Sequence, residues 1–225
     1  MQTSFAQMNL TKYDERVLNF GFTIGYNNSN FRAKLHPDFF GALNDTLLEA
    51  ESSKGPGFNI GIIADVSLND YFSIRFVPSL SFAEKELNYT VCNGTVINGV
   101  CSSTKAQFQS IESIYTALPL LLKYQSKRLK NTRVYIIGGA KYTFDWASNA
   151  EARNADDIVK INKNDIALDY GVGFDFYLTM VKVAVELKAS YGLTNVLARD
   201  VNLIYSRAFD RLSSRSFLLS IHFEG

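Results

Sequence analysis

The sequence lacks the features that mark several common classes of protein. Its 225 residues include only two cysteines, too few for a disulfide scaffold. Only four prolines occur beside 12 tyrosines and 17 phenylalanines, which argues against a disordered chain. The longest uncharged apolar run, 114–122, is far shorter than the roughly 20 residues that a membrane-spanning helix needs. A helical membrane protein is therefore excluded as well.

An excess of charge of one sign is also missing. Lysine and arginine total 23 against 22 aspartates and glutamates, a formal net charge of +1. No general basic field is available to hold nucleic acid, so we expect no nucleic-acid partner. The chain is long enough to bury a core without staples, and it shows neither internal repeats nor a linker. We expect a single domain over residues 7–225.

The first residues resemble the end of a secretory leader. Ser4 and Ala6 are small residues on either side of Phe5, as a signal-peptidase site requires. This pattern predicts that residues 1–6 are the remnant of a signal peptide and that Gln7 begins the mature chain. An ordinary frayed terminus is the alternative.

The dominant pattern along the chain has a period of two, which is typical of β-strands with one apolar face. The pattern recurs in eight segments, 20–26, 58–68, 72–82, 114–124, 134–146, 166–178, 181–193 and 217–223. Short connections at 69–70, 126–132 and 179–180 alternate with long ones at 29–56, 84–109, 147–163 and 194–213. This asymmetry is typical of outer-membrane barrels, which have short periplasmic turns and long extracellular loops.

A soluble lipocalin-type barrel would show the same alternation, with its apolar face turned inward. The apolar face here carries far more bulky side chains than the interior of an eight-stranded barrel can hold. The opposite face is rich in glycine, at Gly21, Gly25, Gly61, Gly139, Gly171, Gly173 and Gly192. We therefore predict an all-β fold, an eight-stranded antiparallel up-and-down transmembrane β-barrel with a polar, side-chain-filled lumen. It would contact lipid in a bacterial outer membrane, with both termini periplasmic and the long loops extracellular.

This polarity places charged residues in the lumen. The acids are Asp65, Asp145, Asp169, Asp175 and Glu186, and the bases are Arg75, Lys123, Lys141, Lys182 and Lys188. Unpaired charges at membrane depth are costly, so we expect ion pairs that plug the barrel. A proton or solute path is the alternative reading.

Candidate catalytic chemistry is sparse. His36 lies in a long loop and His222 points into the lumen, and no cluster has metal-ligand spacing. A lipid-modifying enzyme would need a nucleophile with a base near the rim, yet His222 has no evident partner in the sequence. The glycine run at 171–175 lies within a strand with no helix after it. We expect no enzyme activity, catalytic residue, metal, cofactor or small-molecule substrate.

The two cysteines lie close together in the second long connection. Cys92 and Cys101 flank residues 93–100, which lie outside the cell in this topology. An oxidising compartment would close them as a disulfide and stiffen the loop tip. Two free thiols are the alternative.

Several segments resemble the PorT proteins of Bacteroidota. The similar segments, in chain order, are 16–25, 56–61, 68–80, 118–123, 171–178 and 186–197, and together they span nearly the whole barrel. The resemblance implies an outer-membrane component of the type IX secretion system, which exports proteins across that membrane and also serves gliding motility. It implies a non-enzymatic role through contacts with other type IX components, and it carries over no catalytic residues.

Two surfaces are candidates for such protein contacts. One is an apolar cluster in the outer loops, with Phe31, Phe39 and Phe40. The other is a basic periplasmic turn, with Lys127, Arg128 and Lys130. Loop self-packing and a merely solvated turn are the alternatives. A small structural or adhesion-type barrel without a secretion role is the alternative function.

Overall fold

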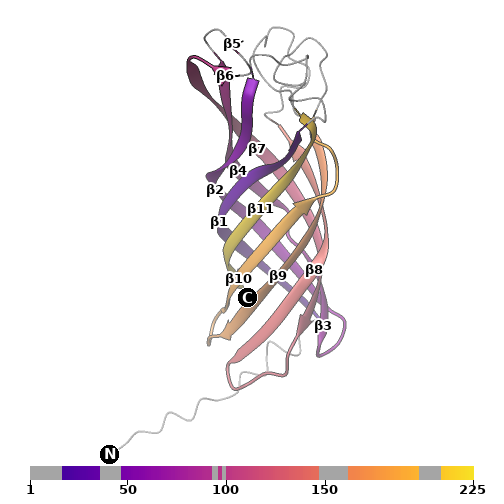
Figure 1. The fold of residues 1–225 in the computed structure, drawn as a ribbon. Helices are drawn as coiled ribbons and strands as arrows, with labels where there is room; N and C mark the ends of the chain where they lie inside the picture. The colour runs from indigo at the N-terminus through magenta and orange to yellow at the C-terminus, as the bar shows by residue number, and fades with distance from the viewer. Residues whose placement is uncertain (1–16, 36–46, 93–95, 98–99, 147–161, 198–208) are drawn as a thin grey trace, which may run out of the picture.

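The chain folds into a closed, upright β-barrel (Figure 1). The structure is a computed structural model that describes residues 17–35, 47–92, 96–97, 100–146, 162–197 and 209–225. In these ranges no helix is both long and apolar enough to cross a membrane. The strands are β1 (Leu18–Leu35), β2 (Leu47–Ser67), β3 (Phe72–Phe76), β4 (Ser79–Cys92), β5 (Val96–Ile97), β6 (Val100–Cys101), β7 (Thr104–Gln125), β8 (Thr132–Asp145), β9 (Asn164–Tyr177), β10 (Lys182–Gly192) and β11 (Phe209–Glu224).

Each strand of the ring pairs antiparallel with its neighbours in the sequence. β1 pairs with β2 on one side and with β11 on the other, which closes the sheet. β3 and β4 follow each other along a single position between β2 and β7. The ring therefore has eight positions, and the predicted eight-stranded antiparallel up-and-down barrel is confirmed. β5 and β6 form a separate two-stranded ribbon.

The predicted strand 72–82 is interrupted where β3 ends and β4 begins. Pro78 has no backbone N–H to donate, but its carbonyl accepts a hydrogen bond of 3.0 Å from the Ile62 amide. The Val77 amide faces the Pro119 carbonyl of β7 at 3.4 Å. Arg75 before the break and Ser79 after it are both buried, so the break leaves the two faces of the strand unchanged.

The apolar face points outward and the polar face inward. In β9, Phe174 and Phe176 are 50% and 41% exposed, whereas Asp175 between them is fully buried. The same outward exposure recurs around the ring, at Ile24, Ile60, Leu120, Ile136, Val172, Leu187 and Leu219. Such a surface is stable in lipid and not in water. The predicted direction of the two faces is therefore correct.

The two ends of the barrel differ. One end carries the tight connections at 68–71, 126–131 and 178–181, and we call it the turn end. At the opposite end, the loop end, β2, β4 and β7 rise well above the other strands of the ring (Figure 1).

The extended strands correct two predicted loops. The predicted connections 29–56 and 84–109 are in large part continuous strand, because β1 runs to Leu35, β2 starts at Leu47 and β4 runs to Cys92. In these extensions polar residues such as Asn30, Arg32 and Glu84 follow the apolar residues of the outer face, so the outward apolar series that marks the predicted strands ends. Backbone hydrogen bonds between strands need no apolar face, which is why the strands continue without that pattern.

Two adjacent glycines in β8 face opposite sides of the wall. A Cβ atom at Gly139 would lie 2.1 Å from the Leu120 carbonyl oxygen and 2.9 Å from the Leu121 Cα of β7. These are backbone atoms of the neighbouring strand, which cannot move aside without disturbing the ladder. A Cβ atom at Gly138 would meet nothing within 4 Å. Gly139 therefore allows β8 to approach β7 closely, whereas Gly138 is not needed for this approach.

We expect Gly139→Ala to lower the free energy of unfolding by about 1–3 kcal/mol, because the added methyl group overpacks the wall. Gly138→Ala is the matched control and should change it little. Urea unfolding in lipid vesicles, followed by the fluorescence of the single tryptophan, Trp146, measures both. Equal stability of the two variants would contradict the close approach.

Candidate functional site

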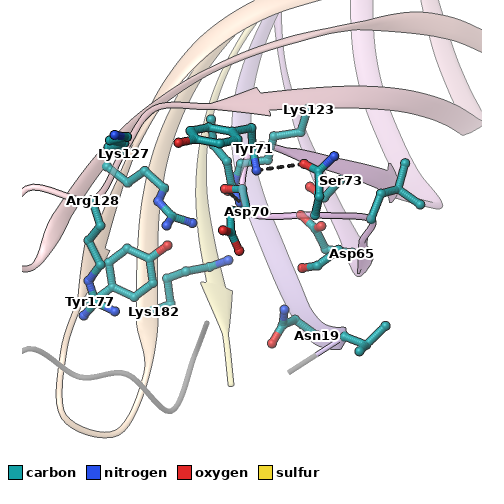
Figure 2. Close-up of a pocket in the computed structure, with 16 residues that line it drawn as sticks. Asn19, Asp65, Asp70, Tyr71, Ser73, Lys123, Lys127, Arg128, Tyr177 and Lys182 are labelled. Carbon is teal, nitrogen blue, oxygen red and sulfur yellow. Dashed lines mark hydrogen bonds between the residues drawn. The ribbon is translucent and has the colours of Figure 1, made fainter. Parts of the chain in front are cut away.

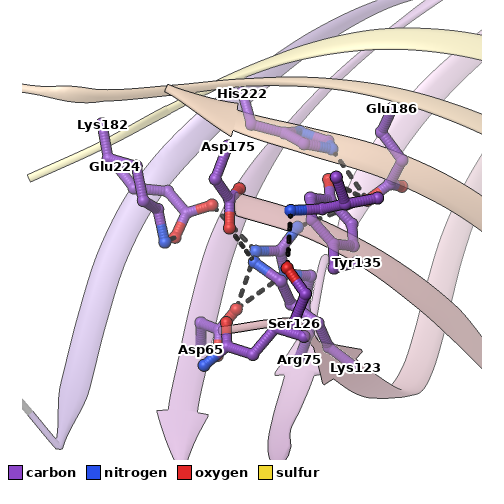
Figure 3. Close-up of polar contacts among 12 residues, drawn as sticks. Asp65, Arg75, Lys123, Ser126, Tyr135, Asp175, Lys182, Glu186, His222 and Glu224 are labelled. Atoms are coloured by element: carbon purple, nitrogen blue, oxygen red, sulfur yellow. Dashed lines mark hydrogen bonds and ion pairs between the residues drawn. The ribbon is translucent and has the colours of Figure 1, made fainter. Parts of the chain in front are cut away.

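A buried arginine lies at the centre of the lumen charges (Figure 3). Arg75 extends from β3 and is 0% exposed. Its Nε donates to Asp65 Oδ2 of β2 at 2.8 Å, and its Nη2 donates to Glu224 Oε1 of β11 at 2.9 Å. Its Nη1 donates to Glu186 Oε2 of β10 at 3.3 Å. The planar guanidinium group has five N–H donors, so one cation bridges carboxylates from three strands.

Four lysines surround this centre with further ion pairs. Lys123 Nζ lies 2.7 Å from Asp175 Oδ2, joining β7 to β9. Lys182 Nζ lies 2.5 Å from Glu224 Oε2, joining β10 to β11. Lys141 and Lys188 both approach Asp169, with Nζ–Oδ distances of 3.5 and 3.4 Å. We call this set of pairs, together with Arg75 and its carboxylates, the lumen network.

The lumen network contains every predicted lumen charge except Asp145. Asp145 ends β8 and lines a small space of about 40 Å³ near the loop end, away from Arg75. The inward placement of the others follows from strand parity, which is visible in the sequence. Their pairing across the hollow could not be read from it, because partners such as Lys123 and Asp175 lie far apart in the chain.

Two members of the site, Glu224 and Tyr135, were not predicted from the sequence. Glu224 binds both Arg75 and Lys182, although it lies next to the end of the chain. Tyr135 donates its hydroxyl hydrogen to Glu186 at 2.9 Å, and Lys123 Nζ lies 4.0 Å from the centre of its ring. Both residues have the inward parity of their strands, and this signal could have identified them.

The contact between His222 and the predicted lumen residue Glu186 was also not predicted from the sequence. His222 Nε2 lies 3.2 Å from Glu186 Oε2. In the ladder His222 faces Ala184 on β10, so Glu186 is its diagonal neighbour two residues along. His222 is buried beside a carboxylate of the lumen network. This position indicates a structural role and not a role at an open rim.

The lumen network divides the hollow into unequal spaces. On its turn-end side lies a cavity of about 550 Å³, which Asp65, Lys123 and Lys182 line from the network side (Figure 2). On the loop-end side, spaces of about 30 and 40 Å³ remain. A water needs a space of about 10–15 Å³, so these spaces hold a few waters at most. The side chains therefore interrupt the lumen.

The predicted basic turn borders the larger cavity. Lys127 and Arg128 line it, whereas exposed Lys130 has a φ of 57° and does not. Arg128 is held in place because its Nε donates to the Lys130 carbonyl at 2.9 Å and its guanidinium carbon lies 4.0 Å from the centre of the Tyr177 ring. The turn thus presents cations in a defined arrangement at the rim.

At the loop end, one predicted partner contact is wrong. Phe31 lies within β1 and is only 3% exposed, so it is not part of an exposed loop cluster. Its odd position in β1 gives it the inward parity of Asn27 and Ser29, which the predicted loop boundary concealed. Phe39 and Phe40 lie outside the described residues.

Cys92 is disulfide-bonded, and the sequence contains one further cysteine, Cys101, which lies in β6. Across the described ranges, no group of three or more histidine, cysteine, aspartate or glutamate residues is arranged to hold a metal ion. The predicted leader, residues 1–6, lies outside the described part of the chain.

Comparisons with known proteins agree with this architecture. The family model described as "Outer membrane protein beta-barrel domain" matches residues 5–198. No curated protein matches the sequence.

The solved structures that are similar to this chain include three outer-membrane proteins. OprG from Pseudomonas aeruginosa is 13% identical, with a TM-score of 0.42 over 92% of this chain and 94% of its own. Ail of Yersinia pestis, in complex with the heparin analogue sucrose octasulfate, is 10% identical, with a TM-score of 0.42 over 93% and 100%. Neisserial surface protein A is 11% identical, with a TM-score of 0.42 over 90% and 95%. Similarity at this level transfers no function.

We expect Arg75→Met to lower the free energy of unfolding by about 3–5 kcal/mol, because it leaves buried carboxylates without their shared cation. Arg215→Met on exposed Arg215 of β11 is the matched control and should change it by less than about 1 kcal/mol. Urea titration in lipid vesicles measures both variants. Equal losses would show that Arg75 is not the centre of the network.

The interrupted lumen predicts that the folded barrel gives no porin-like current steps in planar lipid bilayers, because ion pairs fill its middle. Single-channel recording checks this, with an open porin reconstituted in the same way as the positive control. Stable ohmic steps from the unmodified protein would mean that a continuous water path crosses the lumen network.

Proposed function

Since the chain belongs to the family of outer membrane protein β-barrel domains, we propose that it is a non-enzymatic component of the type IX protein secretion and gliding machinery. It contacts lipid through its apolar wall and acts through protein contacts at its rims. The observation that carries this proposal is the lumen network, which fills the middle of the barrel. With the lumen filled and the wall facing lipid, the rims are the surfaces left for a specific partner.

The type IX assignment rests on the ordered segments that resemble PorT proteins. Placed on the fold, these segments contribute Arg75, Lys123, Asp175 and Glu186, which meet in the lumen network. Segments 68–80 and 118–123 also face each other across the β3–β7 ladder. The resemblance therefore covers residues that pack together rather than scattered strand patterns, which supports its use as a functional guide.

We place the turn end in the periplasm and the loop end outside the cell. β1 starts and β11 ends at the turn end, where Gly21 pairs with Glu224. Short turns and both strand termini on the periplasmic side are the usual arrangement of outer-membrane barrels. In this orientation the basic turn with Lys127, Arg128 and Lys130 faces periplasmic partners of the machinery.

A structural or adhesion-type barrel is the second candidate function. The long extensions of β2, β4 and β7 beyond the other strands favour it, since they raise a stiff surface at the loop end (Figure 1). The disulfide at Cys92 lies in this raised part and would stiffen it further. In this reading the partner binds from outside the cell.

Deleting the gene separates these functions. We expect loss of export of type IX cargo and loss of gliding, both restored by the unmodified gene, because the machinery would lack a membrane component. Immunoblots of cargo in the culture medium and motility assays measure these effects. The abundance of an outer-membrane protein that does not use this route is the control for general envelope damage.

Normal cargo export in the deletion strain would contradict the secretion role, and reduced surface attachment alone would favour the second candidate. Mass spectra of lipid A from the same strain test for enzyme activity. Altered lipid A, restored by the unmodified gene, would contradict the non-enzymatic part of the proposal.

A further inference from the structure

The 550 Å³ cavity at the turn end is a candidate binding site, which we call the turn-end vestibule (Figure 2). Its volume lies within the range of about 300–1,000 Å³ that is common for ligand pockets. The lumen network forms its inner end, with Asp65, Lys123 and Lys182. The β7–β8 turn, with Lys127 and Arg128, borders it at the rim. A ligand that enters from the turn end therefore meets a closed inner end.

The charges of the turn-end vestibule favour an anionic ligand. Its cationic side chains are Lys123, Lys127, Arg128, Arg133 and Lys182, and its carboxylates are Asp65 and Asp70. The whole chain carries a net charge of only +1, so this excess is local. Lys123 and Lys182 bind Asp175 and Glu224 of the lumen network, which weakens their contribution. The positive field is therefore concentrated at the mouth.

The remaining lining suits a polypeptide better than a simple anion. Asn19, Asn69 and Gln125 supply amide groups, which both donate to and accept from peptide groups. The Ser73 hydroxyl group is buried and has no hydrogen-bond partner among the described residues. The rings of Tyr71 and Tyr177 add flat apolar surface to the lining, and the Tyr177 ring lies beside Arg128. An inorganic anion needs only a few of these groups, and a lipid would bind the outer wall instead.

We propose that the turn-end vestibule binds an acidic segment of a partner polypeptide, with the carboxylates of the segment beside Lys127 and Arg128 at the mouth. The amide side chains then bind its backbone, and the lumen network limits how far it enters. This inference rests on the proposed function for the identity of the partner alone, since the binding chemistry belongs to the cavity.

The turn itself offers a matched pair of variants. Lys127 and Lys130 are both exposed lysines of the β7–β8 turn, but only Lys127 lines the turn-end vestibule. Lys127→Glu and Lys130→Glu change the net charge equally and remove no strand residue. A difference between them therefore reports the cavity rather than the general charge of the rim.

The test uses the full chain folded in detergent micelles and a short fluorescein-labelled peptide of alternating glutamate and glycine. Fluorescence anisotropy at about 0.15 M salt, where the Debye length is about 8 Å, measures the Kd. We expect Lys127→Glu to raise the Kd at least about tenfold, since it places like charge beside the ligand. Lys130→Glu should raise the Kd less than about twofold, because solvent and salt screen a charge outside the cavity. Circular dichroism checks that both variants are folded.

Three results would overturn the inference. They are no binding of the glutamate peptide, equal weakening by the two variants, and equally tight binding of a matching glutamine peptide. Displacement of the peptide by inorganic phosphate at equal concentration would also overturn it, by assigning the site to simple anions.

The peptide-binding assay and the deletion strain together separate this inference from the proposed function. Peptide binding with the expected difference, together with normal cargo export in the deletion strain, would support the site and contradict the secretion role. Absent peptide binding, together with lost export in the deletion strain, would contradict the site alone.

Discussion

The pairing of Arg75 with three buried carboxylates is the interaction on which the rest of this barrel depends. Charge at membrane depth has little water to stabilise it, so each buried ion needs a partner inside the protein. Asp65, Glu186 and Glu224 come from three different strands, and one guanidinium group satisfies all three. Because these strands belong to the closed ring, satisfying the charges also fixes the arrangement of the wall around them.

The need to pair the buried charges also explains where this barrel can bind a partner. A lumen filled by ion pairs leaves a hollow of about 550 Å³ at the turn end, whereas two spaces on the other side, among the described residues, are about 30 and 40 Å³. The apolar outer face of the wall contacts lipid. Specific chemistry is therefore concentrated at the rims, and at the turn end it consists of cations and amide groups around a closed cavity.

Much of this architecture could be predicted because strand parity is a local property. Phe174 and Asp175 are adjacent in the sequence and face lipid and lumen respectively, as their alternation indicates. The prediction of strands from parity failed where the residues of the outer face are no longer apolar. Phe31 was assigned to a loop because the residues around it are polar, yet β1 continues through it and buries its side chain. The break at Pro78 was also missed, since it changes the hydrogen bonds without changing either face.

The sequence by itself determined the eight strand positions of the ring, their antiparallel order and, within the predicted strands, the side of the wall on which the residues lie, because alternation and turn length act between near neighbours in the chain. Only the tertiary structure decided which charges meet. Arg75 and Glu224 are separated by 149 positions in the sequence. Closure of the sheet between β1 and β11 brings the last strand, which carries Glu224, into the ring with β3, which carries Arg75. The turn-end vestibule was likewise unpredictable, because a cavity is the space left after side chains from many strands have packed.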